Sequence, residues 1–173
     1  NYIELFKDPV CYTALINNAL FAFVSVVMQS LFGLILAMIL ESRFIGKQKK
    51  IFHTIYFIPA IISVSAVGML WSFISEPSIG LLNSLLNAVG LENMTTAWLG
   101  NAKTAMWSVI WMSQWQYIGY ITILLVVAIQ KIPADLYEAA DIDGANGFQK
   151  SWYITVPQVK EMLLVTIVIT VIG

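Results

Sequence analysis

Charged residues are scarce in this chain of 173 residues, since Asp, Glu, Lys and Arg together make up only 11% of it. Hydrophobic residues make up 59%, and the mean hydropathy is +0.80. This balance lies outside the usual range of soluble domains, in which charged residues are about 25%. The composition therefore indicates a protein whose main solvent is a lipid bilayer.

Cysteine and histidine each occur only once, as Cys11 and His53. A single cysteine excludes a disulfide within the chain, and His53 has no Cys, Asp or Glu at a spacing typical of zinc ligands. Asp141 and Asp143 lie two residues apart on an expected helix, so they do not face each other as a catalytic carboxylate pair would. We expect no metal site and no catalytic residue, and we predict that the chain is not an enzyme.

Two binding motifs are also missing. The nearest candidate for a phosphate-binding loop, Gly46-Lys47, lacks both the upstream glycine and the following hydroxyl residue. The formal net charge is -1, and no basic face interleaved with aromatic residues occurs outside the first connector between apolar runs. We therefore expect no cofactor in this chain and no nucleic acid partner.

Charge is absent from three long runs, which are residues 9–40, 51–75 and 104–130. Each exceeds the roughly 20 residues that a helix needs to cross about 30 Å of hydrocarbon, and a fourth apolar run stops at Gly173. Open strands cannot satisfy their backbone groups in lipid. We therefore predict an all-α, polytopic transmembrane helical bundle, with a kink or a late helix start at Pro59. The expected spans are at about 12–40, 52–74, 104–129 and, truncated, 158–173.

Lysine and arginine near span ends favour the cytoplasm. The three connectors carry unequal numbers of them: Arg43, Lys47, Lys49 and Lys50 in the first, Lys103 in the second, and Lys131, Lys150 and Lys160 in the third. We therefore expect the second connector outside the cell and residues 131–157 in the cytoplasm. Asn1 would then lie outside, which implies a missing upstream span or export signal and thus a partial chain.

The second connector contains a predicted amphipathic helix between Gly80 and Gly90, with leucines on one face. It lies either as a plug at the outer mouth of the bundle or as a docking surface for an external partner. Trp98, just beyond it, suits the headgroup region of a bilayer.

Polar and aromatic residues gather in the outer half of the third span. Four of them are candidates for a substrate pathway, since indoles and amides can stack on and hydrogen-bond a sugar ring: Trp111, Gln114, Trp115 and Tyr117. Packing between helices, with aromatic residues at the membrane interface, explains the same pattern.

The third connector, residues 131–157, predicts two short helices joined by a tight turn. Gly144 can adopt the left-handed conformation that ends a helix. Asn146 and Gln149 resemble a capping box that begins a second helix, which we expect to end at Pro157. The pair would form a compact knob, although a loop lying under the lipid headgroups is an alternative.

Residues 132–145 read IPADLYEAADIDGA, and residues 154–157 read ITVP. This pattern resembles the E-A-A loop of permease subunits in bacterial binding-protein-dependent ABC importers, most of all the sugar branch with its maltose-type and glycerol-phosphate-type permeases. HTIYFIP at 53–59, GLLN at 80–83 and WLG at 98–100 support it, so the resemblance covers most of the chain.

The chain departs from the family pattern at two positions of the predicted second helix. The family tends to have Trp where this chain has Phe148, and Phe where it has Ser151. The resemblance thus implies that the second helix seats less tightly, with a preference for a particular partner ATPase.

The resemblance implies an ATPase-coupling loop that seats in a cleft of a separate cytoplasmic ATPase. Its residues would be Leu136, Tyr137, Glu138, Ala139, Ala140, Asp143, Gly144, Ala145, Phe148, Ile154 and Pro157. Glu138 would make a charged contact, the two alanines would allow close seating, and Gly144 would set the angle between the helices.

The resemblance further implies the middle helices of a six-span core in the bacterial inner (plasma) membrane. The partners would be ATPase subunits that bind ATP and Mg, a second permease subunit and an external solute-binding protein. We therefore predict a permease subunit that conducts a sugar or related solute. A permease for a non-sugar solute and a membrane scaffold for a non-ATPase partner are the alternatives. An ion-coupled carrier would need ionisable groups at mid-membrane, and the three complete spans have no charged residue.

Overall fold

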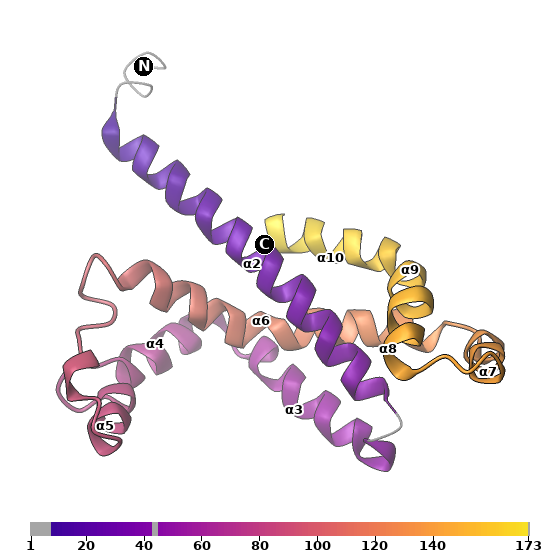
Figure 1. Cartoon of the computed structure of the whole chain (residues 1–173). Helices are drawn as coiled ribbons and strands as arrows, with labels where there is room; N and C mark the ends of the chain where they lie inside the picture. The colour runs from indigo at the N-terminus through magenta and orange to yellow at the C-terminus, as the bar shows by residue number, and fades with distance from the viewer. Residues whose placement is uncertain (1–7, 43–44, 173) are drawn as a thin grey trace. The chain divides into compact units, whose positions relative to one another are not determined.

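The computed structural model describes residues 8–42 and 45–172 of the chain, and each regular element in these ranges is a helix (Figure 1). The predicted all-α class is therefore confirmed. Three residues used in the topology prediction, Asn1, Arg43 and Gly173, lie outside the described ranges.

The elements follow in the order α2 (Pro9–Glu41), η1 (Gly46–Gln48), α3 (Lys49–Ile61), α4 (Val64–Ile74), α5 (Leu81–Ala88), η2 (Glu92–Met94), α6 (Ala105–Gln130), α7 (Ala134–Ile142), α8 (Gly147–Lys150), the π-helical turn η3 (Ser151–Thr155), α9 (Val156–Gln158) and α10 (Lys160–Ile172). By length and composition α2 and α6 can each cross a membrane. The number rises to 4 if α3 with α4, and the helix Gly147–Gln158 with α10, each count as one span.

The interruption between α3 and α4 does not lie at Pro59. Pro59 is inside α3, which begins well before it at Lys49, so the expected late helix start is wrong. The helix instead breaks at Ile62 and Ser63, where the Ser63 backbone is extended and its hydroxyl accepts a hydrogen bond from the N–H of Ala66 (3.3 Å). Serine is a strong N-cap residue, so α4 begins here as a new helix.

The chain divides into two compact units. The first comprises the beginning of α2 together with residues 61–116, which include α4, α5 and the first half of α6. The second comprises residues 25–60 and the chain from residue 117 onward, which include α3, the second half of α6 and every helix from α7 to α10.

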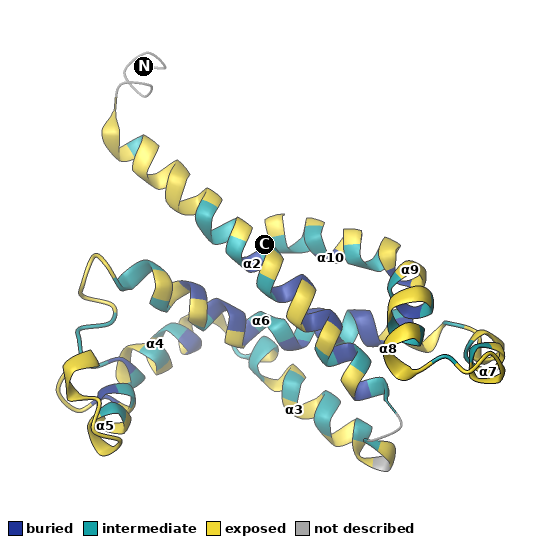
Figure 2. Ribbon diagram, in the orientation of Figure 1, coloured by how far each residue is buried: buried dark blue, intermediate teal, exposed yellow. Residues whose placement is uncertain are grey.

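A continuous apolar core runs through the second unit. Its buried members come from α2, from α6 and from the bend before α10: Leu34, Ala37, Leu40, Ile121, Leu125, Val126, Ile129 and Val159. Figure 2 shows the buried residues along α2 and α6. Small residues allow this packing, since a Cβ at Gly33 would already lie 3.2 Å from Cγ2 of Ile121. The core therefore joins two long helices to the segment that follows residues 131–157.

Candidate functional site

The first helix of the third connector, α7, ends in a tight turn at Gly144. Gly144 has a φ of 77°, in the left-handed region. Its N–H donates to the carbonyl of Asp141 (3.2 Å), and the N–H of Ala145 donates to the carbonyl of Ala140 (2.8 Å). These two bonds form a Schellman motif, which satisfies carbonyls at the end of a helix. The predicted role of Gly144 in ending this helix is confirmed.

The second helix begins with the predicted capping box. The side chain of Asn146 accepts a hydrogen bond from the N–H of Gln149 (2.9 Å), and the side chain of Gln149 accepts one from the N–H of Asn146 (2.8 Å). Two N–H groups that have no partner inside the helix are thereby satisfied. The chain from α7 to the end of α9, residues 134–158, is called the knob below.

The second helix of the knob ends at Gln158, one residue beyond Pro157, so its end lies within one residue of the predicted position. Residues Ser151–Thr155 form a π-helical turn, in which the N–H of Val156 donates to the carbonyl of Ser151. Proline lacks an N–H and its ring crowds the carbonyl of the preceding turn. A wider turn directly before Pro157 accommodates both effects, and the helix bends by 66° only on entering α10.

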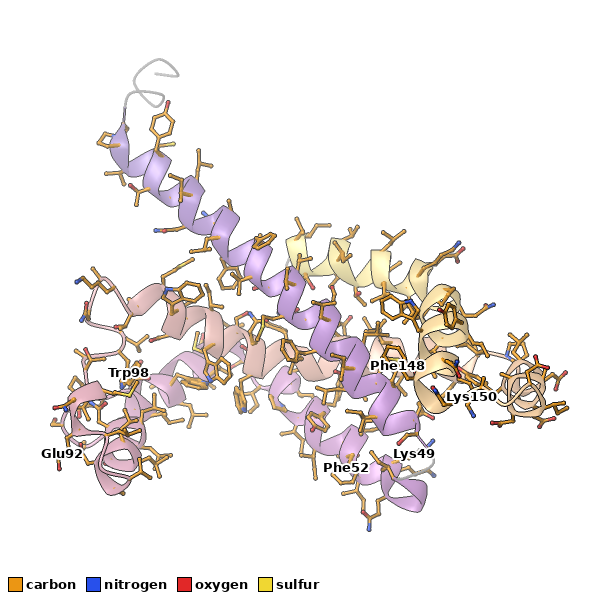
Figure 3. All side chains as sticks on the ribbon, in the orientation of Figure 1. Lys49, Phe52, Glu92, Trp98, Phe148 and Lys150 are labelled. Carbon is orange, nitrogen blue, oxygen red and sulfur yellow. The ribbon has the colours of Figure 1, made fainter. Side chains whose placement is uncertain are left out.

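Two side-chain contacts join α7 to the second helix of the knob. The hydroxyl of Tyr137 lies 2.9 Å from the hydroxyl of Thr155, whose side chain is buried. Nζ of Lys150, which is labelled in Figure 3, lies 2.6 Å from Oδ1 of Asp141. An exposed ion pair alone contributes little stability, but the part-buried hydroxyl pair fixes where the two helices meet. Together with the turn at Gly144, these contacts hold the knob as one structural element.

The structure exposes most of the residues predicted to contact an ATPase. The exposed ones are Leu136, Glu138, Ala139, Asp143, Gly144, Phe148 and Pro157, and the half-buried ones are Tyr137, Ala140, Ala145 and Ile154. Trp152, which was not among them, stacks on Phe148 with the ring centroids 6.4 Å apart and the planes 6° from parallel. The knob therefore presents both small side chains and an exposed aromatic pair.

Both ends of the knob rest on the apolar core of the second unit. Ile132, just before α7, and Val156 pack against this core, and Val159 is one of its buried members. Close-packed interiors transmit displacement rather than absorb it. A force applied to the knob would therefore reach the core residues of α2 and α6.

The candidate pathway residues on α6 do not share one exposed face. Trp111 is 61% exposed, whereas Gln114 is 4% exposed. Trp115 lies edge-on to Trp71 of α4, with the ring centroids 6.0 Å apart, and Tyr117 is half-buried. The structure therefore separates the exposed indole of Trp111 from the buried amide of Gln114, and it adds Trp71 as the neighbour of Trp115.

Gln116 has a hydrogen-bond partner outside its own helix. Its side chain is buried, and Nε2 donates to the carbonyl of Ile62 (3.1 Å). Ile62 lies at the break between α3 and α4, where carbonyls lose their partners inside the helix. An unsatisfied carbonyl at membrane depth costs several kcal/mol, so the amide stabilises the broken helix.

The predicted helix of the second connector is present as α5, between Gly80 and Gly90. The buried Asn83 links it to the chain that follows: Nδ2 donates to the carbonyls of Pro77 and Thr96, each at 3.0 Å, and Oδ1 accepts from Nε1 of Trp98 at 2.8 Å. The indole N–H of Trp98, labelled in Figure 3, is thus bonded within the connector.

The same connector contains a carboxylate with a shifted pKa. Oε2 of Glu76 accepts hydrogen bonds from the N–H groups of Ser78 and Ile79, both at 2.7 Å. The bond from Ile79, followed by that from the Ser78 hydroxyl, holds the pKa of Glu76 below its ordinary value. Among the residues that the structure describes, no three His, Cys, Asp or Glu side chains gather in a way that could hold a metal ion.

Comparisons with known proteins match this chain to membrane components of ABC transporters. Residues 14–173 match the family described as binding-protein-dependent transport system inner membrane component. The probable ABC transporter permease protein YurN of Bacillus subtilis (strain 168) is 53% identical over 173 residues, which are 100% of this chain and 59% of YurN.

A second relative and a solved structure agree with these matches. The arabinooligosaccharides transport system permease protein AraP of Halalkalibacterium halodurans is 34% identical over 174 residues, covering 100% of this chain and 54% of AraP. The crystal structure of a bacterial ABC transporter involved in the import of the acidic polysaccharide alginate superposes with a TM-score of 0.89 at 26% identity. That match covers 98% of this chain and 58% of the other. The chain thus spans little more than half the length of the proteins it matches.

Proposed function

This chain belongs to the family of binding-protein-dependent transport system inner membrane components, and from that premise we propose that it conducts a sugar or related solute across the inner membrane. It would do so as one permease subunit of an ATP-driven importer. Members of the family are non-catalytic, multi-pass membrane subunits, so ATP and Mg would be bound by a separate cytoplasmic ATPase. A second permease subunit and an external solute-binding protein would complete the assembly.

The observation that carries this proposal is the construction of the knob. Its two helices are joined by a Schellman turn and by the Tyr137–Thr155 contact, and both of its ends rest on the core of the second unit. It is thus a stiff projection, with Glu138 and Ala139 exposed on it. Such a projection suits a part that is seated in a partner's cleft and moved by it.

The proposed direction of the knob is toward the cytoplasm. Lysines cluster in the first and third connectors, and Lys103 is the single lysine of the second. The positive-inside tendency supports a cytoplasmic location for residues 131–157, where an ATPase would meet them.

The proposal of a sugar as solute is supported by the relatives. AraP is described as a permease for arabinooligosaccharides, and the structural neighbour as an importer of alginate. We place the solute pathway along the outer half of α6, near Trp111, Gln114, Trp115 and Tyr117. Indoles with exposed faces offer stacking surfaces to sugar rings, and Trp111 is the most exposed of these residues.

Co-purification of the full-length permease with its candidate ATPase tests the docking step. Glu138→Arg should abolish retention of the ATPase, because it reverses the charge of the proposed contact. Glu161→Arg makes the same change at an exposed glutamate outside the knob and should leave retention unchanged. Equal retention by both variants would contradict the proposal.

Two glycines at the turn of the knob, Gly144 and Gly147, provide a second variant with a matched control. A Cβ has open space at both Gly144 and Gly147, but only Gly144 has a left-handed backbone. Gly144→Ala should weaken ATPase retention by roughly tenfold, because left-handed backbone costs other residues about 1–2 kcal/mol. Gly147→Ala should not weaken it.

Transport itself is tested in proteoliposomes that contain the permease, the ATPase and the binding protein. Arabinotriose and an alginate trisaccharide serve as neutral and acidic probes of ATP-dependent uptake. Uptake of either supports a sugar importer. ATPase binding without uptake of either probe would favour a non-sugar solute, and retention of a non-ATPase protein alone would favour the scaffold alternative.

A further inference from the structure

The ends of three helices in the second unit meet at one carboxylate. Glu41 is the last residue of α2, Lys49 is the first of α3, and Gln130 is the last of α6. Oε2 of Glu41 lies 2.9 Å from Nζ of Lys49, and Oε1 accepts a hydrogen bond from Nε2 of Gln130 (3.0 Å). Figure 3 labels Lys49 at the beginning of α3.

Lys49 is bound to Glu41 twice, since Nζ also donates to the backbone carbonyl of Glu41 (3.0 Å). An ammonium group at the C-terminal end of a helix interacts favourably with the helix dipole. Nε2 of His53 lies 3.6 Å from Oε1 of the same carboxylate. Only 15% of the Glu41 side chain and 31% of the Lys49 side chain are exposed, so solvent and salt screen this ion pair less than they screen a surface pair, whereas Gln130 is exposed.

A partly buried ion pair contributes little to overall stability, because desolvation offsets most of the attraction. Such a pair instead fixes the relative position of the helix ends that it joins, because it has one favourable arrangement, whereas apolar contacts can slide. Here the arrangement defines how the ends of α2 and α3 lie against the end of α6.

Gln130 lies just before the knob in the chain, so the contacts of Glu41 are made next to the segment that enters the knob. α7 begins at Ala134, only a short turn after Gln130, and the N–H of Ile132 still donates to the carbonyl of Ile129 (3.1 Å). The segment that leads into the knob is therefore continuous with α6 and lies next to the Glu41 carboxylate. Apolar packing already couples α2 to α6, and a close contact at Gly119 couples α3 to it, so a polar link at the helix ends adds a fixed register between the three helices.

We infer that Glu41 is a positioning residue of the coupling step, which fastens the ends of α2 and α3 to α6 so that displacement of the knob moves all three as one body. This inference rests on the proposed function, because it requires an ATPase that moves the knob. Glu41 touches neither ATPase nor solute in this role. It acts through Lys49 and Gln130.

Exchanging the charges of Glu41 and Lys49 tests whether the ion pair itself matters, rather than the presence of a glutamate at position 41. In the double variant Glu41→Lys, Lys49→Glu the ion pair is re-formed in the opposite sense. The amide of Gln130 has both a donor and an acceptor, so it can turn its oxygen toward a lysine at position 41. The salt bridge is thus restored although no original charge remains in place, while the bond from Nζ of Lys49 to the backbone carbonyl of Glu41 is lost.

The test is a spin-label distance in the full-length permease assembled with its ATPase. Labels are attached at Asp135→Cys on α7 and Ile39→Cys on α2, both exposed positions, with Cys11 and any other native cysteine replaced by serine. Distances are recorded without nucleotide and with ATP, Mg and vanadate. The wild-type background should show one distance in both states, because knob and α2 move together.

Glu41→Gln should retain the ATPase but give an ATP-dependent change in this distance, and the charge-exchanged double variant should lose that change again. Glu161→Gln, on α10, should behave as wild type. An unchanged distance in Glu41→Gln, or no recovery in the double variant, would overturn the inference. So would loss of the ATPase from Glu41→Gln, since Glu41 would then shape the knob itself. If the wild-type permease does not retain the ATPase, the proposed function itself fails.

Discussion

Gly119 of α6 lies directly against the backbone carbonyl of Tyr56 in α3, so closely that an added Cβ would overlap the carbonyl oxygen. The next residues along both helices, Phe57 and Tyr120, also meet, with their ring centroids 6.5 Å apart. In lipid, helices associate through close packing of this kind, and small residues make it possible. Gly119 is therefore a point of very close approach between α3 and α6.

Replacement of Gly119 by alanine should destabilise the protein, because the Cβ can be accommodated only if the two helices move apart. Overpacking of a well-packed site typically costs about 1–3 kcal/mol. Thermal unfolding of the full-length permease in detergent should show a lower midpoint. Gly68→Ala is the matched control, since a Cβ there meets nothing within 4 Å. Equal midpoints for the two variants would contradict the close contact.

Asn83→Ala should loosen the connector that contains α5. The change removes one buried side chain that bonds to Pro77, Thr96 and Trp98. A buried group left without its partner costs about 1–3 kcal/mol. Proteolysis of this connector in the purified permease should therefore become faster. Asn87, on the same helix but exposed, provides the control, and an equal effect of Asn87→Ala would argue against a special role for Asn83.

The turn after Glu76 should depend on pH. Because the pKa of Glu76 in the folded protein lies below its ordinary value of 4.5, its ionised form stabilises the turn. This contribution is present above pH 4.5 and is lost as the pH falls through the lowered pKa. Hydrogen exchange at the N–H groups of Ser78 and Ile79, corrected for intrinsic rates, should then accelerate. In Glu76→Gln this pH dependence should disappear, whereas Glu92→Gln should preserve it.

Tyr137→Phe should loosen the knob without changing its shape. The variant loses only the hydroxyl that contacts Thr155, and a single hydrogen bond contributes about 0.5–1.5 kcal/mol. Amide hydrogen exchange within α7 should accelerate severalfold. Tyr153→Phe removes the same atom from an exposed ring and should have no effect. A rate increase of the same size in both variants would count against the Tyr137–Thr155 contact.

Local rules were sufficient to predict the form of the knob. Glycine at a helix end and the Asn146–Gln149 pair act over a few residues, so their outcomes can be read from spacing, and the structure contains both. The apolar runs likewise predicted the helical class. In each case the deciding interactions lie within one helix or one turn.

The remaining features depend on residues far apart in the chain. Gln116 bonds to Ile62 because α4 and α6 pack together, and Glu41 is joined to Gln130, which lies 89 residues further along the chain. No local pattern indicates either pair. The break after Pro59 could be predicted only in part from the local sequence. Proline predicted an interruption, but Ser63 as N-cap determined where the new helix begins.

The π-helical turn at Ser151–Thr155 makes the knob sensitive to chain length. Such a turn contains one residue more than an α-helical turn, and one residue corresponds to about 100° of rotation around a helix axis. The extra residue therefore sets the rotation, about the helix axis, of the exposed Phe148–Trp152 pair relative to the buried Thr155. Deleting a single residue here would redirect the aromatic pair while every side chain beyond the turn stayed in place. At this point an insertion or a deletion therefore re-aims the outer surface of the knob.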